Sequence, residues 1–458
     1  MEDWLGITRI ENNGRGQATK VTYPDGKEVS YTYGKAGERT GIIYPDGREV
    51  TYAYDEALRL RKLRDKEQEI SYHYKQGHLV GKIAKTKENQ LETRYDYNHK
   101  GLLNSLTHRQ GEEILDAYSY TYNALGFKTK VTKERKDYLE DSGTYEYTYD
   151  PLGRLEEVRK DTILQSKYVY DSFGNRIQKK TPNGNTRYQY NGLNQLMTQR
   201  EEGTETSLLT EYTYDKRGNL SSIAENGVRT QEYFFGALNR LEKVVNLKSG
   251  KGAAYQYNGL GHRTGKVEGS PTSPILPTTK IAELELNPTK QIEDVIDLTR
   301  GYHNLLERSE GTNLTSFTWD GNVVSMTGQG NATYSYLQDD LGSPIRVLGN
   351  EGEEVYGYDE FGIRTHTERT SHVISSSQPF TYTGYQADEV ARSYYAQMRE
   401  YRPEVGRFVS EDSVKGFTVE PVTMNQYNYC FNNPMIYIDE NGAFGHLFVG
   451  AIIGAVGG

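Results

Sequence analysis

The sequence predicts an all-β fold, a long antiparallel sheet built from successive hairpins. Of 458 residues, 39 are Tyr and 47 are Gly, and the pattern Tyr-x-Tyr returns at nearly constant spacing. Tyrosine favours strands and glycine favours tight turns, so this composition is typical of many short strands joined by reversing turns. We therefore expect the helix content to fall well below the roughly 30% of an average globular protein.

The tyrosine repeat covers most of the first 260 residues. Successive copies lie 20 to 27 residues apart, and the pattern comes back after a gap. The two rings of a Tyr-x-Tyr pair point to the same face of a strand, so adjacent copies should line one face of the sheet and supply its core. The second aromatic residue of each copy is Tyr33, Tyr54, Tyr74, Tyr97, Tyr122, Tyr149, Tyr170, Tyr190, Tyr214, Phe235, Tyr257, Tyr336 and Tyr358.

Turn signals follow each tyrosine pair. In the run Tyr149-Asp150-Pro-Leu-Gly153, the aspartate can bond the backbone two residues on, and the glycine accepts the positive φ that closes a type I turn with a bulge. A second turn class, Pro-Asp-Gly at residues 24–26 and 45–47, lies between tyrosine copies. Each period should contain two strands, which gives roughly 25 to 30 strands at ~4.8 Å spacing and a sheet too long to stay flat.

Between residues 268 and 330 the repeat is lost. Proline residues at 271, 274, 277 and 288 lie among Ser and Thr and predict an irregular connector, while residues 292–307 are compatible with a short helix or with another strand. The predicted organisation is repeats over residues 1–267, the connector over 268–330, a second patterned region over 331–443 and a short apolar tail over 444–458.

Composition excludes several classes of function. The net charge is −9 and the pI about 5.7, which disfavours nucleic-acid binding. Cys430 is the only cysteine, so there is no intrachain disulfide or multi-cysteine zinc site, and the nine His residues show no metal-ligand spacing. We predict no metal, no cofactor and no small-molecule ligand. The N-terminus lacks the pattern of a signal peptide, and the apolar tail is too short to span a bilayer as a helix, so we expect the chain to be part of a longer protein and any membrane contact to involve only residues after 443.

The motifs resemble a known family. The Tyr-x-Tyr-Asp-x-x-Gly-Arg/Asn-Leu repeat over residues 20–265 resembles the YD repeat of Rhs proteins, which also occurs in insecticidal toxin complexes and teneurins. Residues 334–442 are similar, motif by motif, to the Rhs repeat-associated core, including Gly406-Arg407-Phe408-Val-Ser-Glu-Asp412. The resemblance implies a sheet curved into part of a spiral shell, open at this length. It also implies a secreted or cell-surface bacterial toxin whose partners are its own C-terminal effector, a delivery machinery and an immunity protein.

The resemblance further implies aspartate-dependent self-cleavage just after the core. The positions that match the two family aspartates are Asp412 and Asp439, and the matching scissile bond joins Ala443 to Phe444. Two carboxylates that share a proton could activate water and protonate the leaving amide, as in aspartic proteases. We expect the two carboxylates to lie within one hydrogen bond or one bridging water of each other, near residue 443.

Alternatives remain open at this point. The family has proline after both aspartates, whereas Ser413 and Glu440 stand here, which could relax the turns. Asp439-Glu-Asn-Gly is also a good turn in its own right. The alternative function is a surface adhesion or carbohydrate-binding module without proteolysis, in which exposed tyrosines stack on sugars, although most rings should pack within the sheet. Cys430 is expected to be a buried thiol rather than a nucleophile.

Overall fold

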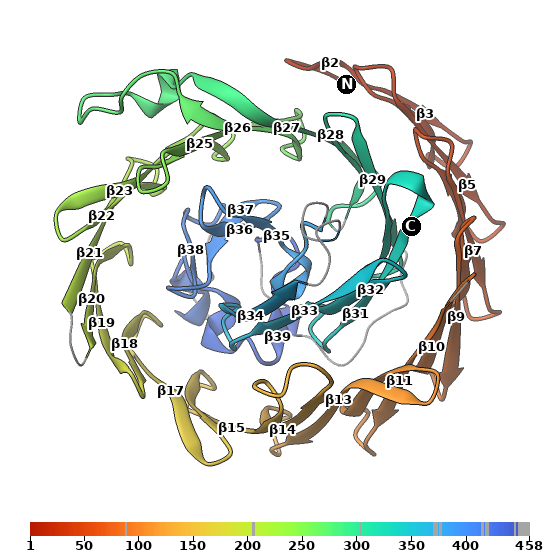
Figure 1. Ribbon diagram of the computed structural model, residues 1–458, viewed down its shortest axis with the longest axis horizontal. Helices are drawn as coiled ribbons and strands as arrows, with labels where there is room; N and C mark the ends of the chain where they lie inside the picture. The colour runs from red at the N-terminus through yellow and green to blue at the C-terminus, as the bar shows by residue number, and fades with distance from the viewer. Residues whose placement is uncertain are drawn as a thin grey trace.

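The computed structural model describes residues 1–87, 89–203, 207–302, 304–369, 374, 378–413, 416, 421–443 and 446–447. The chain winds as a spiral of antiparallel strands, with β35 (Gln386–Asp388) to β39 (Tyr437–Ile438) at its centre (Figure 1). Its elements in these ranges are strands and five short 3-10 helices, which confirms the all-β prediction. Among the same residues, no helix has the length and apolar character needed to cross a membrane.

Thirty-two strands, β3 to β34, form one sheet in which each strand pairs with the next along the chain. No pairing joins β3 to β34 among the described residues, so the sheet coils and stays open, as predicted. The outer turn of the spiral (residues 9–271) consists of β3 (Arg9–Asn12), β4 (Ala18–Thr22), β5 (Glu28–Tyr33), β6 (Arg39–Ile43), β7 (Glu49–Tyr54), β8 (Leu60–Arg64), β9 (Gln68–Lys75), β10 (His78–Thr86), β11 (Gln90–Tyr97), β12 (Leu103–Gln110), β13 (Glu113–Tyr122), β14 (Lys128–Arg135), β15 (Gly143–Tyr149), β16 (Leu155–Lys160), β17 (Ile163–Tyr170), β18 (Arg176–Thr181), β19 (Gly184–Tyr190), β20 (Leu196–Gly203), β21 (Ser207–Tyr214), β22 (Leu220–Glu225), β23 (Val228–Phe235), β24 (Leu241–Asn246), β25 (Lys251–Tyr257) and β26 (Arg263–Pro271).

The sheet then turns inward, and smaller elements fill the centre (Figure 1). The inner turn (residues 286–369) consists of β27 (Leu286–Ile296), β28 (Leu305–Glu310), β29 (Asn313–Trp319), β30 (Val323–Thr327), β31 (Thr333–Gln338), β32 (Pro344–Gly349), β33 (Gly352–Tyr358) and β34 (Arg364–Arg369). The remaining strands are β1 (Glu2–Asp3), β2 (Gly6–Ile7), β35 (Gln386–Asp388), β36 (Ser393–Ala396), β37 (Arg399–Arg402), β38 (Arg407–Phe408), β39 (Tyr437–Ile438) and β40 (His446–Leu447), and the 3-10 helices are η1 (Ile281–Glu283), η2 (Gln329–Asn331), η3 (Tyr382–Gly384), η4 (Pro421–Met424) and η5 (Cys430–Asn432).

The predicted turn is a five-residue unit, here called the YD turn, and residues 150–154 show its geometry. The Asp150 N–H donates to the Arg154 carbonyl and the Gly153 N–H to the Asp150 carbonyl, both at 2.9 Å. Asp150 Oδ1 accepts the N–H groups of Leu152 and Arg154 at 3.0 Å, and Arg154 Nε donates to Oδ2 at 2.6 Å. Gly153 has φ +79°, which a side chain would strain. The motif therefore supplies three parts: an aspartate that accepts hydrogen bonds, a glycine in the left-handed conformation, and an arginine whose side chain donates to the aspartate.

In seven copies of the repeat, the hydroxyl of the second tyrosine ties its strand to the preceding strand. The Tyr149 hydroxyl donates to the Lys128 carbonyl at 2.6 Å, and the Tyr170 hydroxyl to the Leu155 carbonyl at 2.8 Å. Each acceptor is the first residue of the strand that immediately precedes the tyrosine's own strand in the sheet. The rings pack with the inward-facing clusters of the sheet, as predicted. The same bond joins Tyr33 to Ala18, Tyr74 to Leu60, Tyr122 to Leu103, Tyr190 to Arg176 and Tyr257 to Leu241.

The stretch predicted as an irregular connector differs from the structure. β27 to β30 continue the sheet through it, and the long loop is confined to residues 272–285. Residues 292–296 and 305–307 are strand rather than helix. The missed signal is Phe317-Thr-Trp319-Asp320, which keeps the aromatic pair and the aspartate of the repeat but not its tyrosines. The domain boundaries themselves stay a prediction.

Ion pairs join the two turns of the spiral where they overlap. Arg39 of the outer turn pairs with Asp297 of the inner turn at 2.7 Å, and Lys82 pairs with Asp320 at 3.1 Å. Asp297 and Asp320 also accept the hydroxyls of Tyr31 and Tyr72. The cations lie on the outer turn and the anions on the inner turn in both ties. Burial of both partners makes each tie costly to break from one side only.

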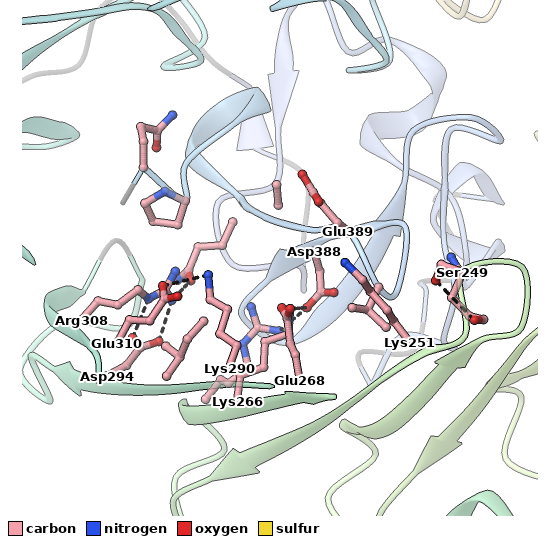
Figure 2. Close-up of a pocket in the computed structure, with 18 of the residues that line it drawn as sticks. Ser249, Lys251, Lys266, Glu268, Lys290, Asp294, Arg308, Glu310, Asp388 and Glu389 are labelled. Carbon is pink, nitrogen blue, oxygen red and sulfur yellow. Dashed lines mark hydrogen bonds and ion pairs between the residues drawn. The ribbon is translucent and has the colours of Figure 1, made fainter. Parts of the chain in front are cut away.

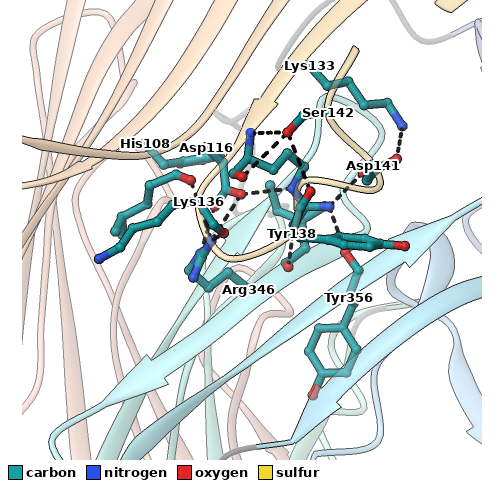
Figure 3. A network of polar contacts seen from close by, with 12 residues as sticks. His108, Asp116, Lys133, Lys136, Tyr138, Asp141, Ser142, Arg346 and Tyr356 are labelled. Carbon is teal, nitrogen blue, oxygen red and sulfur yellow. Dashed lines mark hydrogen bonds and ion pairs between the residues drawn. The ribbon is translucent and has the colours of Figure 1, made fainter. Parts of the chain in front are cut away.

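The most buried tie is the polar network around Asp116 (Figure 3). Asp116 of β13 accepts a bond from Arg135 Nε of β14 and one from Arg346 Nε of β32, both at 2.9 Å. Arg135 also donates to the Ile345 carbonyl and Arg346 to the Lys136 carbonyl, so each guanidinium crosses between the turns. Burial would raise the pKa of Asp116, but the two guanidinium groups outweigh it and hold the pKa below its usual value. The network therefore fastens the inner turn inside the outer one.

Candidate functional site

Residues 378–413 and 421–443, here called the core, lie at the centre of the spiral (Figure 1). β35 to β38 form a small antiparallel sheet, and aromatic rings pack against it. Tyr401 and Tyr429 approach to 4.3 Å between ring centroids, and Tyr401 and Phe408 to 5.7 Å. This aromatic cluster packs against β38 and β39, and the two predicted aspartates, Asp412 and Asp439, follow these strands.

The structure brings Asp412 and Asp439 to one guanidinium. Arg399 Nη2 lies 2.8 Å from Asp412 Oδ2 and 3.4 Å from Asp439 Oδ2. Arg399 comes from β37, and its Nε donates to the Gly442 carbonyl, one residue before Ala443. The two carboxylates, separated by 27 positions in the sequence, therefore lie at the same cation and beside the chain that leads to the predicted cleavage site. Phe444 lies outside the described residues.

Asp439 lies in a turn that shares two features with the YD turns, the side-chain bond to the fifth residue and a glycine of positive φ at the fourth. Its Oδ1 accepts the Ala443 N–H at 3.0 Å, four residues on, as Asp150 Oδ1 accepts the Arg154 N–H. Gly442 has φ +72°, and a Cβ there would lie 2.5 Å from the Ala396 carbonyl oxygen. The interpretation of Asp439 as a turn aspartate is thus confirmed, and the same residue also takes part in the charged cluster.

Burial controls the electrostatics of this cluster. Asp439 is 2% exposed, and burial lowers the pKa of Arg399 below its usual value, against the opposing effect of the two carboxylates. Burial, together with the charge of Asp439, raises the pKa values of Tyr385 and Cys430 well above their usual values. Among the described residues, Arg399 is thus a cation in contact with both carboxylates in a poorly solvated place.

Sequence reasoning did not find Arg399. Two carboxylates that are buried together need a cation or a proton beside them. Arg399 lies two residues before Tyr401 in the matched motif, so a basic residue near the predicted aspartates was the signal that could have identified it. Arg399 also stacks on Phe408, with 3.6 Å between the guanidinium carbon and the ring centroid. It is therefore fixed by packing as well as by charge.

Cys430 is buried, as predicted. In the described ranges, no cluster of His, Cys, Asp or Glu side chains has the arrangement of a metal site.

A second polar region is a cavity of about 580 Å³ between the wall of the spiral and the core (Figure 2). Lys266 pairs across it with Asp388 at 2.9 Å, and Arg308 pairs with Asp294 at 2.7 Å. Acidic and basic side chains are mixed in its lining, and Lys290 also pairs there with Glu310 at 2.8 Å. The ion pair between Lys266 and Asp388 joins β26 to β35.

The sequence matches two family models. It matches the RHS Repeat over residues 13–49 and the Teneurin YD-shell over residues 59–252. It is 28% identical over 316 residues to the tRNA3(Ser)-specific nuclease WapA of Bacillus spizizenii, which covers 67% of this chain and 12% of that protein. It is 30% identical over 336 residues to Toxin protein Tse5 of Pseudomonas aeruginosa, which covers 65% of this chain and 25% of that protein.

Among solved structures, the chain is similar to TcdB2-TccC3-TEV, with a TM-score of 0.39 and 16% identity over 95% of this chain and 27% of that one. The chain thus spans a quarter or less of the length of the two curated relatives. The repeat in the sequence, the hairpins and turns that it forms and the two family matches together show that this chain is a member of the Rhs/YD-repeat family.

Proposed function

We propose that this chain is the effector-proximal part of a toxin shell, and that it cuts itself between Ala443 and Phe444. The relatives named as a nuclease and a toxin support the shell of a toxin-type protein. The observation that carries self-cleavage is the pair of aspartates on Arg399, one of which accepts the Ala443 N–H. The expected partners are the effector that follows the core, a delivery machinery and an immunity protein, in a secreted or cell-surface setting.

The chemistry needs a base, an acid and a fixed peptide. One carboxylate takes a proton from water while the water oxygen bonds to the Ala443 carbonyl carbon, and the other carboxyl group gives its proton to the Phe444 nitrogen as the C–N bond breaks. Arg399 holds the carboxylates together and fixes the neighbouring Gly442 carbonyl. The turn hydrogen bond from Ala443 to Asp439 keeps the scissile residue beside the acid. Asp412, whose side chain is 15% exposed, is the more accessible of the two carboxylates and suits the role of base.

Mass spectrometry of the purified 458-residue chain tests self-cleavage. The expected product has lost residues 444–458, and both Asp412→Asn and Asp439→Asn should retain the full mass because the change removes the base or acid at nearly constant shape. Asp25→Asn is the matched control, since Asp25 lies in an exposed turn of the wall. An uncut wild-type chain would refute self-cleavage, and cleavage that persists in both variants would refute the role of the two aspartates.

The alternative of a carbohydrate-binding adhesion module has less support. The repeated tyrosines face inward and pack in the hydrophobic clusters of the sheet, and many of their hydroxyls donate to backbone carbonyls of the sheet. The genetic context distinguishes the two functions. An effector coding region in frame after Gly458, followed by a small immunity-type gene, supports the toxin shell, whereas a cell-wall anchor in frame supports adhesion.

A further inference from the structure

The core binds the outer turn through the backbone of its YD turns. The contacted turns, here called the YD rim, are residues 150–154, 171–175, 191–195 and 215–219. Asn433 Nδ2 donates to the Gly153 carbonyl and Asn432 Nδ2 to the Gly174 carbonyl, both at 2.7 Å. Asn432 has φ +59°, a conformation that asparagine tolerates better than most residues, so its side chain is held toward the rim by an unusual backbone.

A second set of donors comes from the segment around residue 426. Asn425 Nδ2 donates to the Phe173 carbonyl at 3.1 Å, and the Tyr427 hydroxyl donates to the Gly218 carbonyl at 2.8 Å. All four of these core residues are at least nine-tenths buried. The contacts join residues that are 209 to 280 positions apart in the chain. These four acceptors are carbonyls of the repeated turn, and two rim side chains add to them: Asn175 Oδ1 accepts from Asn425 Nδ2 at 2.8 Å, and Gln195 Nε2 donates to the Tyr427 hydroxyl at 3.2 Å.

The segment that makes these rim contacts is hydrogen-bonded to the charged cluster of Asp412, Arg399 and Asp439. The carbonyl of Gln426, which lies between the two docking residues Asn425 and Tyr427, accepts the Asp412 N–H at 3.0 Å and Arg399 Nη1 at 3.0 Å. A shift of the docking segment would therefore move one aspartate and the arginine together.

The second docking pair is linked to the other aspartate. The Asn433 carbonyl accepts the Tyr437 N–H at 3.2 Å, and Tyr437 begins β39, which ends one residue before Asp439. Each of the two aspartates is thus connected to the YD rim by its own route, through a docking side chain and one backbone hydrogen bond.

We propose that the YD rim is a checkpoint for the cluster: Asp412, Arg399 and Asp439 assemble only when the turns between β15 and β22 have folded. The purpose of this device rests on the proposed function, because self-cleavage then waits for a completed wall and does not release the effector from an unfolded shell. Asn425, Tyr427, Asn432 and Asn433 are positioning residues in this scheme, since they act through the backbone of the aspartate-bearing loops.

Two variants weaken the docking, and each has a matched control in the same chain. Gly218→Ala adds a Cβ that would lie 2.7 Å from the Tyr427 hydroxyl, whereas in Gly126→Ala the nearest atom is Leu102 Cδ1 at 3.9 Å. Both glycines occupy the same turn position, with φ +81° and +84°, so the local strain is equal. Tyr427→Phe removes only the hydroxyl that binds the rim. Its control is Tyr122→Phe, which removes a hydroxyl bonded within the outer turn.

Hydrogen exchange of the full chain reads the assembly without depending on cleavage. The amides of Asp412 and Ala443 are bonded within the cluster region, and we expect them to exchange about tenfold faster in Gly218→Ala and Tyr427→Phe, the effect of one lost buried hydrogen bond. The two control variants should exchange as the wild type does at these positions. Unchanged exchange in both docking variants would overturn the checkpoint.

Cleavage, measured by mass on the same samples, separates the two proposals. Faster exchange with slower loss of residues 444–458 in the docking variants alone supports the checkpoint and its purpose. Faster exchange with an uncut wild type supports the docking and refutes self-cleavage. Faster exchange with cleavage at the wild-type rate overturns the checkpoint, because the cluster would then work without the rim.

Discussion

Asp116→Asn should loosen the spiral at the place where its two turns are fastened. Asp116 is the shared acceptor for Arg135 of the outer turn and Arg346 of the inner turn, and all three side chains are buried. Asparagine keeps the shape but loses the charge, and its amide group would face a guanidinium donor. The substitution therefore leaves two buried cations with one anion fewer, while it creates no cavity.

The expected cost follows from this loss of charge. Removing one partner of a buried ion pair destabilises a protein by about 3–5 kcal/mol, because the other partner stays buried without compensation. The remaining anions reduce the effect only in part, since Glu353 is one-third exposed and Asp141 already binds Lys133. Before the change the network contains three cations and three anions, namely Arg135, Arg346, Lys133, Asp116, Asp141 and Glu353.

Equilibrium unfolding in urea measures this cost. The free energy of unfolding should fall by about 3–5 kcal/mol in Asp116→Asn, and circular dichroism and tyrosine fluorescence should report coincident transitions if unfolding stays cooperative. Glu28→Gln is the control, because its pair with Lys20 is exposed and screened by solvent, so this change should leave the free energy of unfolding nearly unaltered. An effect of Asp116→Asn no larger than that of the control would refute the reasoning that buried charge fastens the turns.

Three further outcomes are expected. Burial raises the pKa of Glu307 to about 7, so the folded chain keeps a proton that the unfolded chain has lost, and stability should fall as pH rises from about 5 to 7. Glu307→Gln should therefore stabilise the protein by about 1–3 kcal/mol at pH 8 and by little at pH 4.5, and equal gains in urea unfolding at both pH values would contradict this. Tyr149→Phe removes the bond to the Lys128 carbonyl and should cost about 1 kcal/mol in the same assay, whereas no cost would show that water replaces the hydroxyl. Asp150→Ala removes the acceptor of two turn amides, so limited proteolysis should cut faster within residues 150–154 than in the wild type, and an unchanged rate would argue that the glycine alone sets the turn.

The sheet of the spiral could be predicted from the sequence, because the residues that determine each strand and turn are close together in the chain. Tyr-x-Tyr fixes a face, and the aspartate and glycine after it fix a turn, so a period of about 22 residues is readable without knowledge of distant contacts. The prediction failed where the ring type changed: Phe317 and Trp319 make the same strand as a tyrosine pair, yet a search for tyrosine does not find them. The prolines of the same stretch led to the prediction of an irregular connector. Pro288 nevertheless lies in a strand, at a register shift where a missing N–H is tolerated.

The charged cluster was only partly predictable. Asp412 and Asp439 came from motif resemblance, which carries no geometry, and Arg399 could be placed between them only by the fold. The docking of Asn432 and Asn433 on the rim was out of reach for the same reason, since the contacts cross more than 250 residues and no sequence pattern pairs these asparagines with the turns that they bind. Local chemistry was readable, whereas the pairing of distant loops was not.

One difference between two turns explains how a structural unit of the wall becomes part of a charged site. In the turn at residues 150–154, Asp150 Oδ1 accepts the N–H of Arg154, and the side chain of the same arginine occupies Oδ2. In the turn that begins at Asp439, the equivalent position is Ala443, which has no side-chain donor, and Oδ2 lies instead beside Arg399 from another strand. The backbone bond from residue five of the turn is kept in both. The turn at residues 150–154 thus pairs its aspartate with its own arginine, while the turn at Asp439 places the second carboxylate oxygen beside a cation that Asp412 shares.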